Sequence, residues 1–246
     1  MAKPLYQVQG SGPPFVYVPG LEGTGKLFYK QAEDLARDHT VITFPLRPDG
    51  HYTMSQLVKD LVWIIRDAGF ARATVLGESF GGLLVLATAL AHPAIFERMI
   101  LVSTFACFAN RAKINFGVLL YSLLPYALIK AYRSKRARHE LYSADIAEID
   151  RITHHELTRV IPFEGYMSRL RIIRETDLRA RLSEIKVPAL IVAGTEDRLL
   201  DAVGAARELT QKLPRARLKL LEGTGHMVLL SNRVRVRDWL VEFEQF

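Results

Sequence analysis

The feature that most constrains the fold is a regular alternation of short apolar runs with longer helical patterns. The apolar runs are rich in β-branched and aromatic residues, and several are apolar throughout, as expected of strands buried on both faces of a parallel sheet. They occupy residues 15–18, 41–44, 74–76, 99–102, 189–192 and 218–221. The helical patterns occupy residues 26–37, 55–68, 82–91, 202–212 and 233–246. The alternation predicts an α/β fold with a mostly parallel, doubly wound sheet and right-handed crossovers.

The alternation is interrupted once, between residues 102 and 189. This stretch is too long for a single loop in a compact domain. Helical patterns fill it at residues 116–132, 140–160 and 167–182. We therefore predict a core domain of residues 1–104 and 176–246 and a helical cap of residues 105–175. Functional sites in open parallel sheets lie at the carboxyl ends of the strands, so a cap inserted after a strand would cover the site.

Composition agrees with a globular domain carrying an insertion. Hydrophobic residues make up 49% of the 246 residues, which is enough for a full-sized core. The single cysteine, Cys107, excludes an internal disulfide framework and fits a reducing compartment. The first 14 residues show no signal-peptide pattern, and no run of about 18 apolar residues suggests a membrane span. We expect a cytoplasmic protein.

The basic charge is concentrated in the predicted cap. Of the formal net charge of +7, residues 105–175 contribute 12 Lys or Arg against 7 Asp or Glu. Two interpretations of this excess are open. It is either an ordinary solvated surface or, more specifically, a surface that prefers anionic substrates or membrane surfaces. Five cations follow the apolar stretch without an intervening acid: Lys130, Arg133, Lys135, Arg136 and Arg138. We expect weak contact with an acidic membrane surface there and no nucleic-acid partner, and the oligomeric state stays open.

A candidate nucleophile lies at a predicted strand-to-helix turn. Residues 77–81 read Gly-Glu-Ser-Phe-Gly, between the strand at 74–76 and the helix at 82–91. Flanking glycines allow a turn so tight that the hydroxyl of Ser79 is thrust out of the sheet. The ordinary alternative is a serine that only caps the helix. In this strand–turn–helix context the pattern favours a nucleophile.

A serine nucleophile needs a base, and the base needs a third group to orient it. Asp197 and His226 each lie in the loop just past a predicted strand, in the chain order serine, acid, histidine. Taken singly, the aspartate could be a helix cap and the histidine a loop residue. Asp201 and Glu196 are alternative acids, but Asp201 has the pattern of an N-cap for the next helix. We therefore predict a triad of Ser79, His226 and Asp197.

Acyl transfer also needs donors for the oxyanion. The main-chain N–H of Phe80, just after the nucleophile, is one candidate, and that of Leu21, in the loop after the strand at 15–18, is the other. The same loop runs Gly-x-x-x-x-Gly-Lys, one residue short of a phosphate-binding P-loop, and Leu27 stands where Ser or Thr would hold Mg²⁺. We therefore predict neither a nucleotide site nor any metal or organic cofactor.

The apolar part of the predicted cap supplies candidate substrate contacts. The stretch on both sides of Pro125 is apolar almost all round, and the proline predicts two short helices in place of one. One side would contact the sheet domain and another would line the substrate pocket. The predicted substrate-binding residues are Phe116, Leu120, Leu124 and Met227.

Over nearly its whole length the sequence resembles the α/β-hydrolase superfamily. The resemblance rests on Gly-Glu-Ser-Phe-Gly-Gly at 77–82, on Ile-Lys-Val-Pro at 185–188 leading into Leu-Ile-Val-Ala-Gly-Thr-Glu-Asp at 190–197, and on Gly-Thr-Gly-His at 223–226. Many members have His-Gly where Pro19-Gly20 stands here, and the continuation is similar to small bacterial esterase- or thioesterase-like members. The resemblance implies the α/β-hydrolase fold with a helical cap. Ser79 argues against the dehalogenases and epoxide hydrolases, which use aspartate.

The predicted activity is hydrolysis of a carboxylic ester with a small or medium-chain apolar group, through an acyl-enzyme. Hydrolysis of acyl-thioesters or of carbon–carbon bonds, and acyl transfer, use the same triad and stay open, because fold does not choose among them. An alternative from another class is a non-catalytic receptor that binds a ligand on the same fold.

Overall fold

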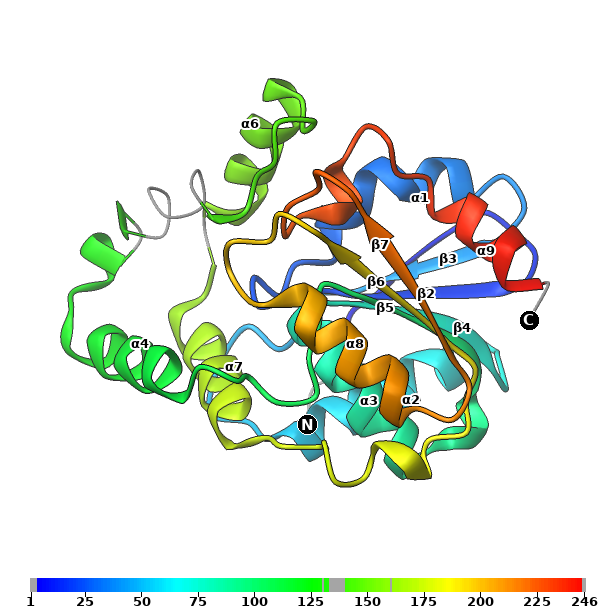
Figure 1. Ribbon diagram of the computed structural model, residues 1–246, viewed down its shortest axis with the longest axis horizontal. Helices are drawn as coiled ribbons and strands as arrows, with labels where there is room; N and C mark the ends of the chain where they lie inside the picture. Colours follow the sequence, from blue (N-terminus) through cyan, green and yellow to red (C-terminus); the bar gives the residue numbers. More distant parts are fainter. Residues whose placement is uncertain (1–3, 130, 133–139, 160, 245–246) are drawn as a thin grey trace.

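The computed structural model describes residues 4–129, 131–132, 140–159 and 161–244 (Figure 1). Across these residues seven strands form one sheet in the order β1-β3-β2-β4-β5-β6-β7. The strands are β1 (Gln7–Gln9), β2 (Pro14–Val18), β3 (Thr40–Thr43), β4 (Ala73–Glu78), β5 (Phe96–Val102), β6 (Ala189–Gly194) and β7 (Ala216–Leu221). Only β1 pairs antiparallel among these described strands. The prediction of a mostly parallel α/β sheet is confirmed.

Helices cover both faces of the sheet (Figure 1). The described helices are η1 (Gly25–Phe28), α1 (Tyr29–Leu35), α2 (Met54–Asp67), α3 (Phe80–Ala91), η2 (Pro93–Ile95), α4 (Arg111–Leu123), α6 (Glu148–Thr158), α7 (Phe163–Glu175), η3 (Leu182–Glu184), α8 (Ala202–Lys212), η4 (Val228–Leu230) and α9 (Val236–Glu244). Apolar side chains of α2, α3 and α8 pack on one face, and those of α1 and α9 pack on the other. The core is therefore a three-layer sandwich.

The sheet is buried on both faces, which explains why its strands are apolar throughout. In β6 the side chains of Leu190 and Val192 pack under α9, and those of Ile191 and Ala193 pack in the cluster with α8. Successive strand residues point to opposite faces, so each face needs its own apolar set. The edge strand β1 is different: its three residues are exposed, and it carries no apolar run from which it could be predicted.

The helices α4, α6 and α7 and the short helix η3 lie between β5 and β6 in the chain. In Figure 1, α4 and α7 lie side by side at one end of the molecule, and α6 lies apart from them. The predicted break at Pro125 is confirmed: α4 ends at Leu123, and Leu124, the residue before the proline, is extended at φ −90° and ψ 146°. The division into a core of residues 1–104 and 176–246 and a cap of residues 105–175 stays a prediction.

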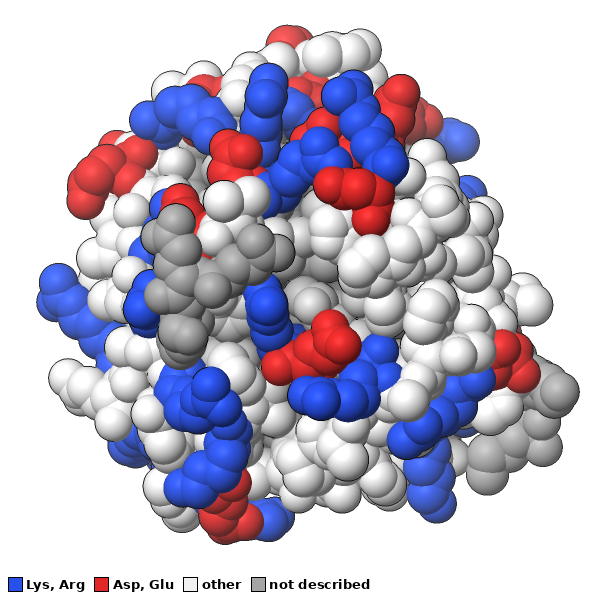
Figure 2. Space-filling model, turned by 90° about the vertical axis from the view of Figure 1, so that its right-hand side faces the viewer, with Lys and Arg blue, Asp and Glu red and all other residues white. Residues whose placement is uncertain are grey.

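On the face shown in Figure 2, Lys and Arg side chains are interspersed with Asp and Glu, as on an ordinary solvated surface. The run of cations predicted to contact an acidic membrane surface lies outside the described residues: Lys130, Arg133, Lys135, Arg136 and Arg138. In the described part of the chain, every helix is too short or too polar to cross a membrane.

Candidate active site

Ser79 occupies the single position between β4 and α3. Its backbone lies in the left-handed region, at φ 53° and ψ −116°, which is uncommon for a residue with a side chain. Close main-chain contacts explain the flanking glycines. A Cβ on Gly77 would lie 2.7 Å from the main chain of Gly82, and a Cβ on Gly81 would lie 2.2 Å from the carbonyl oxygen of Val18. The sequence therefore forms the strained turn that projects the hydroxyl above the sheet.

The structure brings Ser79, His226 and Asp197 together. The His226 Nε2 atom lies 3.1 Å from Ser79 Oγ, and its Nδ1 atom lies 2.7 Å from Asp197 Oδ2. Asp197 Oδ1 accepts hydrogen bonds from the N–H groups of Leu199, at 2.8 Å, and Leu200, at 3.1 Å. With the ring proton on Nδ1 donated to the carboxylate, Nε2 is free to accept the serine proton.

The alternative acids are placed elsewhere. Asp201 is the N-cap of α8, and its Oδ1 accepts from the N–H of Gly204 at 2.9 Å, as its position before the helix predicts. Glu196 is exposed. Of the three candidate acids, only Asp197 contacts the histidine in the described structure.

A second buried carboxyl lies close to the histidine, and sequence reasoning did not identify it. Glu78 is 3% exposed, and its Oε2 accepts a hydrogen bond from the Tyr17 hydroxyl at 2.5 Å. Burial raises the pKa of Glu78, opposed by the tyrosine hydrogen bond and by His226. Burial by itself lowers the pKa of His226, but Asp197, Glu78 and Glu140 outweigh it, so the histidine pKa is raised.

The candidate oxyanion donors lie beside the nucleophile. Phe80 is the first residue of α3, so its N–H is one that the helix does not use. Gly20 and Leu21 line the same cavity as Ser79, and a Cβ built on Gly20 would lie 3.5 Å from the serine Cβ. Thr104, two residues after the end of β5, was not predicted. Its hydroxyl donates to the carbonyl oxygen of Ser79 at 2.6 Å and so stabilises the strained turn.

The site opens into a cavity of about 770 Å³. One wall is mostly apolar and is built largely by the segment between β5 and β6: Phe105, Phe108, Ile114, Tyr121, Tyr166, Leu170 and Ile173. The α6 side contributes polar groups: Glu148, Arg151, His154, His155, Thr158 and Arg159. The cavity therefore combines an apolar wall with a hydrogen-bonding one.

Of the predicted substrate contacts, only Met227 lines this cavity. Phe116 points outward with 63% of its surface exposed, while Leu120 and Leu124 pack against the core without reaching the cavity. The reason is helical phase, since α4 turns a different face inward: Ile114, Gly117 and Tyr121. An almost uniformly apolar stretch contains no signal for choosing that face.

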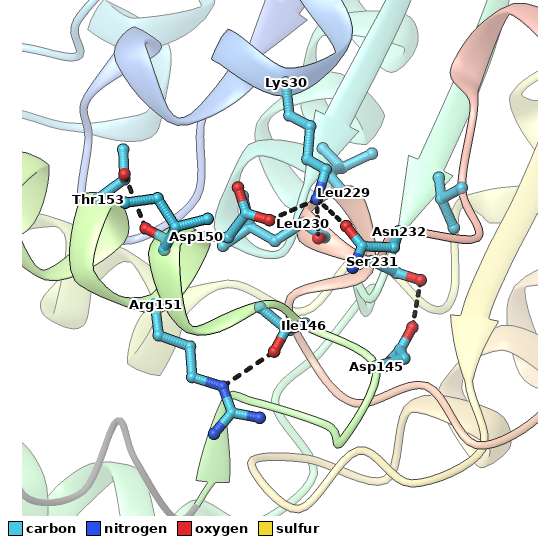
Figure 3. A network of polar contacts seen from close by, with 12 residues as sticks. Lys30, Asp145, Ile146, Asp150, Arg151, Thr153, Leu229, Leu230, Ser231 and Asn232 are labelled. Atoms are coloured by element: carbon cyan, nitrogen blue, oxygen red, sulfur yellow. Dashed lines mark hydrogen bonds and ion pairs between the residues drawn. The ribbon is translucent and has the colours of Figure 1, made fainter.

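Polar contacts bind the α6 segment to the core close to the histidine loop (Figure 3). Lys30 of α1 donates to Asp150 Oδ2 at 2.5 Å and to Asn232 Oδ1 at 2.6 Å. The hydroxyl of Ser231 donates to Asp145, which precedes α6. This network fixes the α6 segment onto the loop that follows the candidate base.

Comparison with known proteins agrees with this architecture. A protein of Pseudomonas savastanoi pv. phaseolicola named "Putative carbamate hydrolase RutD" is 24% identical over 247 residues, covering 94% of this chain and 93% of its own. A hydrolase from Pseudomonas aeruginosa PA01 superposes with a TM-score of 0.86 at 22% identity, over 98% of this chain and 94% of its own. The enol-lactonase from Burkholderia xenovorans LB400 superposes with a TM-score of 0.82 at 26% identity, over 98% and 96%.

The strongest assignment is to a family. Residues 49–232 match the Hydrolase_4 family, described as serine aminopeptidase, S33, and this range includes the positions of Ser79, Asp197 and His226. The match extends over most of the chain, and the superpositions share the sheet and its flanking helices. The chain therefore belongs to the serine aminopeptidase S33 family of the α/β-hydrolase superfamily.

Proposed function

We propose that this protein is a serine esterase that hydrolyses carboxylic esters with a small or medium-chain apolar group. The observation that carries the proposal is the hydrogen-bonded series from Ser79 Oγ through His226 to Asp197, with contacts of 3.1 and 2.7 Å; Ser79 and His226 line the cavity. Both distances are within the reach required of a nucleophile, its base and the group that orients the base.

The chemistry follows from these positions. Ser79 Oγ attacks the ester carbonyl while its proton passes to His226 Nε2, and the N–H groups of Leu21 and Phe80 receive the oxyanion. Asp197 stabilises the imidazolium. The imidazolium then protonates the leaving alcohol, and the C–O ester bond breaks to leave the acyl-enzyme. Water activated by His226 attacks the acyl-enzyme, releasing the acid and restoring Ser79.

The cavity supports an apolar acyl or alcohol group of moderate size. Its volume of about 770 Å³ lies within the range usual for pockets that enclose small organic ligands. We take residues 105–175 as the cap of this pocket, because α4 and α7 supply most of its apolar wall. Esters longer than acetate would bury more apolar surface there, at about 25 cal/mol per Å².

The comparisons support carbonyl hydrolysis and add one competing substrate class. The enol-lactonase is named for a lactone, which is a cyclic ester, and it is 26% identical. The competing class is carbamates, after the name of the relatives called putative carbamate hydrolases. A carbamate carbonyl is bonded to nitrogen, and the same triad could attack it. Thioester hydrolysis and acyl transfer also share the first half-reaction. Relative turnover distinguishes these classes.

The test is a substrate panel: p-nitrophenyl acetate, butanoate and octanoate, an acyl thioester and an aryl carbamate. We expect turnover of the esters, faster for butanoate or octanoate than for acetate. Ser79→Ala should lower turnover by a factor on the order of 10⁶. Ser103→Ala is the matched control, because Ser103 is also buried at a strand end with positive φ and its Oγ has no hydrogen-bond partner among the described residues.

A fluorophosphonate provides an independent test of the nucleophile. It should add once, on Ser79, as located by mass spectrometry. An adduct on Ser103 or Ser231, or full activity in Ser79→Ala, would contradict the assignment. A folded protein that turns over no member of the panel would favour a ligand-binding role on this fold.

A further inference from the structure

Arg169 lies within α7 and is 1% exposed, although it carries a guanidinium group. Such a group is costly to bury unless its donors are used. Its Nε donates to the carbonyl oxygen of Leu21 at 2.7 Å, and Nη2 donates to that of Glu22 at 3.5 Å. Its Nη1 donates to the Tyr52 hydroxyl at 2.8 Å and to the carbonyl oxygen of Arg47 at 3.2 Å. The guanidinium therefore holds main chain that belongs to the core.

The loop that receives this side chain is shaped around it. Gly23 has φ +72°, and a Cβ built on it would lie 2.8 Å from Arg169 Cζ. A side chain at this position would therefore meet the guanidinium, besides straining the backbone. The Gly23 N–H donates to the carbonyl oxygen of Gly20 at 3.0 Å, which closes the loop into a turn. The turn and the arginine thus form one packed unit.

This turn contains the candidate oxyanion donor. The carbonyl held by Arg169 and the N–H proposed to receive the oxyanion belong to the same residue, Leu21, on either side of one Cα. The Leu21 N–H shares its peptide plane with the carbonyl of Gly20, which accepts from the Gly23 N–H at 3.0 Å, and the Gly23 N–H shares its plane with the carbonyl of Glu22. By holding the carbonyls of Leu21 and Glu22, Arg169 restricts the peptide planes that adjoin or hydrogen-bond to the Gly20–Leu21 plane, and so restricts the direction of the Leu21 N–H. A misplacement of about 1 Å at such a donor can cost about 10² in rate.

We propose that Arg169 is a positioning residue for the oxyanion hole, which fixes the Leu21–Glu22 main chain so that the Leu21 N–H faces the carbonyl oxygen under attack. The proposal rests on the esterase function above. It makes α7 part of the mechanism: the helix that lines the substrate cavity also sets the geometry of the oxyanion donor. A lysine could not replace the arginine fully, because an ammonium lacks the planar fork that spans several acceptors.

A purely structural role, in which Arg169 only docks α7 onto the core, makes different predictions. Other contacts already serve docking: the Gly165 N–H donates to the carbonyl oxygen of Pro48 at 3.0 Å. The hydroxyl of Ser168 donates to the carbonyl oxygen of Gly50 at 2.9 Å, and Ser168 is 2% exposed. Ser168→Ala is thus a matched control, since it removes a buried hydrogen bond between α7 and the core without touching the oxyanion loop.

The experiment compares wild type, Arg169→Met, Arg169→Lys and Ser168→Ala on p-nitrophenyl butanoate. Each protein is also titrated with an alkyl trifluoromethyl ketone. Ser79 Oγ adds to the ketone carbonyl, the serine proton passes to His226, and the former carbonyl oxygen bears the negative charge. This adduct reports on the oxyanion hole, whereas KM reports mainly on ground-state binding. Thermal unfolding identifies the variants that are folded.

We expect Arg169→Met to lower kcat by about 10² with KM changed less than about threefold, and to raise Ki for the ketone by about the same 10². Arg169→Lys should show a smaller loss of the same kind and serves as the test if the Met variant does not fold. Ser168→Ala should keep wild-type kcat and Ki. Arg169 variants that match Ser168→Ala, or that raise KM alone, would overturn the proposal.

Failure of this inference is distinguishable from failure of the proposed function. If the esterase proposal is wrong, wild type neither turns over the ester nor takes up the fluorophosphonate on Ser79. If only the role of Arg169 is wrong, wild type and the Arg169 variants turn over the ester and bind the ketone alike.

Discussion

Replacing Asp197 by asparagine probes the proposed triad through a conflict that can be read from its hydrogen bonds. Asp197 Oδ1 accepts from two main-chain N–H groups, those of Leu199 at 2.8 Å and Leu200 at 3.1 Å, while Oδ2 faces His226 Nδ1 at 2.7 Å. Asparagine has one acceptor oxygen for these two directions. If that oxygen stays on the main-chain donors, its NH₂ group faces the histidine.

The structure favours this unproductive orientation. Turning the amide round would point its NH₂ at the two N–H donors that face the buried side chain of residue 197, leaving both unsatisfied at about 1–3 kcal/mol each. With the NH₂ group facing Nδ1, that nitrogen must accept, so the ring proton moves to Nε2, which can no longer take the proton of Ser79. A total penalty of about 2–6 kcal/mol, converted at about 1.36 kcal/mol per tenfold, gives a loss of about 30-fold to 3 × 10⁴-fold. Loss of the charge that stabilises the imidazolium adds to it, so we expect about 10⁴ in kcat, the size known for serine proteases.

The assay is turnover of p-nitrophenyl butanoate, with circular dichroism to verify the fold. Asp201→Asn is the matched control, because asparagine caps a helix about as well as aspartate does, and its activity should stay within about twofold of wild type. If Asp197→Asn keeps more than about a tenth of wild-type turnover, or if Asp201→Asn is the damaging change, the tautomer argument is refuted.

Two further predictions concern the groups around the site. Glu78→Gln removes a carboxyl that helps raise the pKa of His226. The pH at which kcat/KM rises, as the histidine loses its proton, should therefore move downward. A pH profile that is unchanged or moves upward contradicts this prediction. Asp150→Asn removes the buried carboxylate bound by Lys30 and should lower the free energy of unfolding, measured by urea titration, by about 2 kcal/mol. Glu208→Gln, in an exposed ion pair, is the control and should change it by less than about 0.5 kcal/mol. A loss in Asp150→Asn as small as that in the control would show that the network in Figure 3 does not stabilise the fold.

Several features were predictable because their signals are local in the sequence. Strands buried on both faces must be apolar throughout, so the parallel sheet was evident from short runs of residues. The tight turn at Ser79 needs glycines within two positions of it, and Pro125 ends α4 through its own ring and the restriction on its neighbour. The position of Ser79, Asp197 and His226 after the parallel strands β4, β6 and β7 indicated which side chains would meet at one sheet edge.

Other features depended on contacts that no local pattern encodes. Strand β1 is exposed and is held by its pairing with β3, so no hydrophobic run marks it. Packing against α7 decided which face of α4 points inward. Phe116 is exposed as a result, and Ile114, Gly117 and Tyr121 line the cavity. Glu78 is a variable position of the serine motif in sequence, but its hydrogen bond to Tyr17 and its proximity to His226 exist only once β2, β4 and the histidine loop are assembled.

By itself, the sequence determined the layered α/β core, the strained serine turn and the chain order of the candidate acid and base, because each follows from the conformational preferences or hydrophobicity of neighbouring residues. Only the tertiary structure decided how the loop with the candidate oxyanion donor is held. In sequence Arg169 is one of the 12 Lys or Arg residues between 105 and 175, yet it is buried against the carbonyl of Leu21, 148 residues away along the chain. A contact across that separation depends on how α7 docks onto the sheet domain, and docking is set by the summed packing of many side chains, not by the residues next to the arginine.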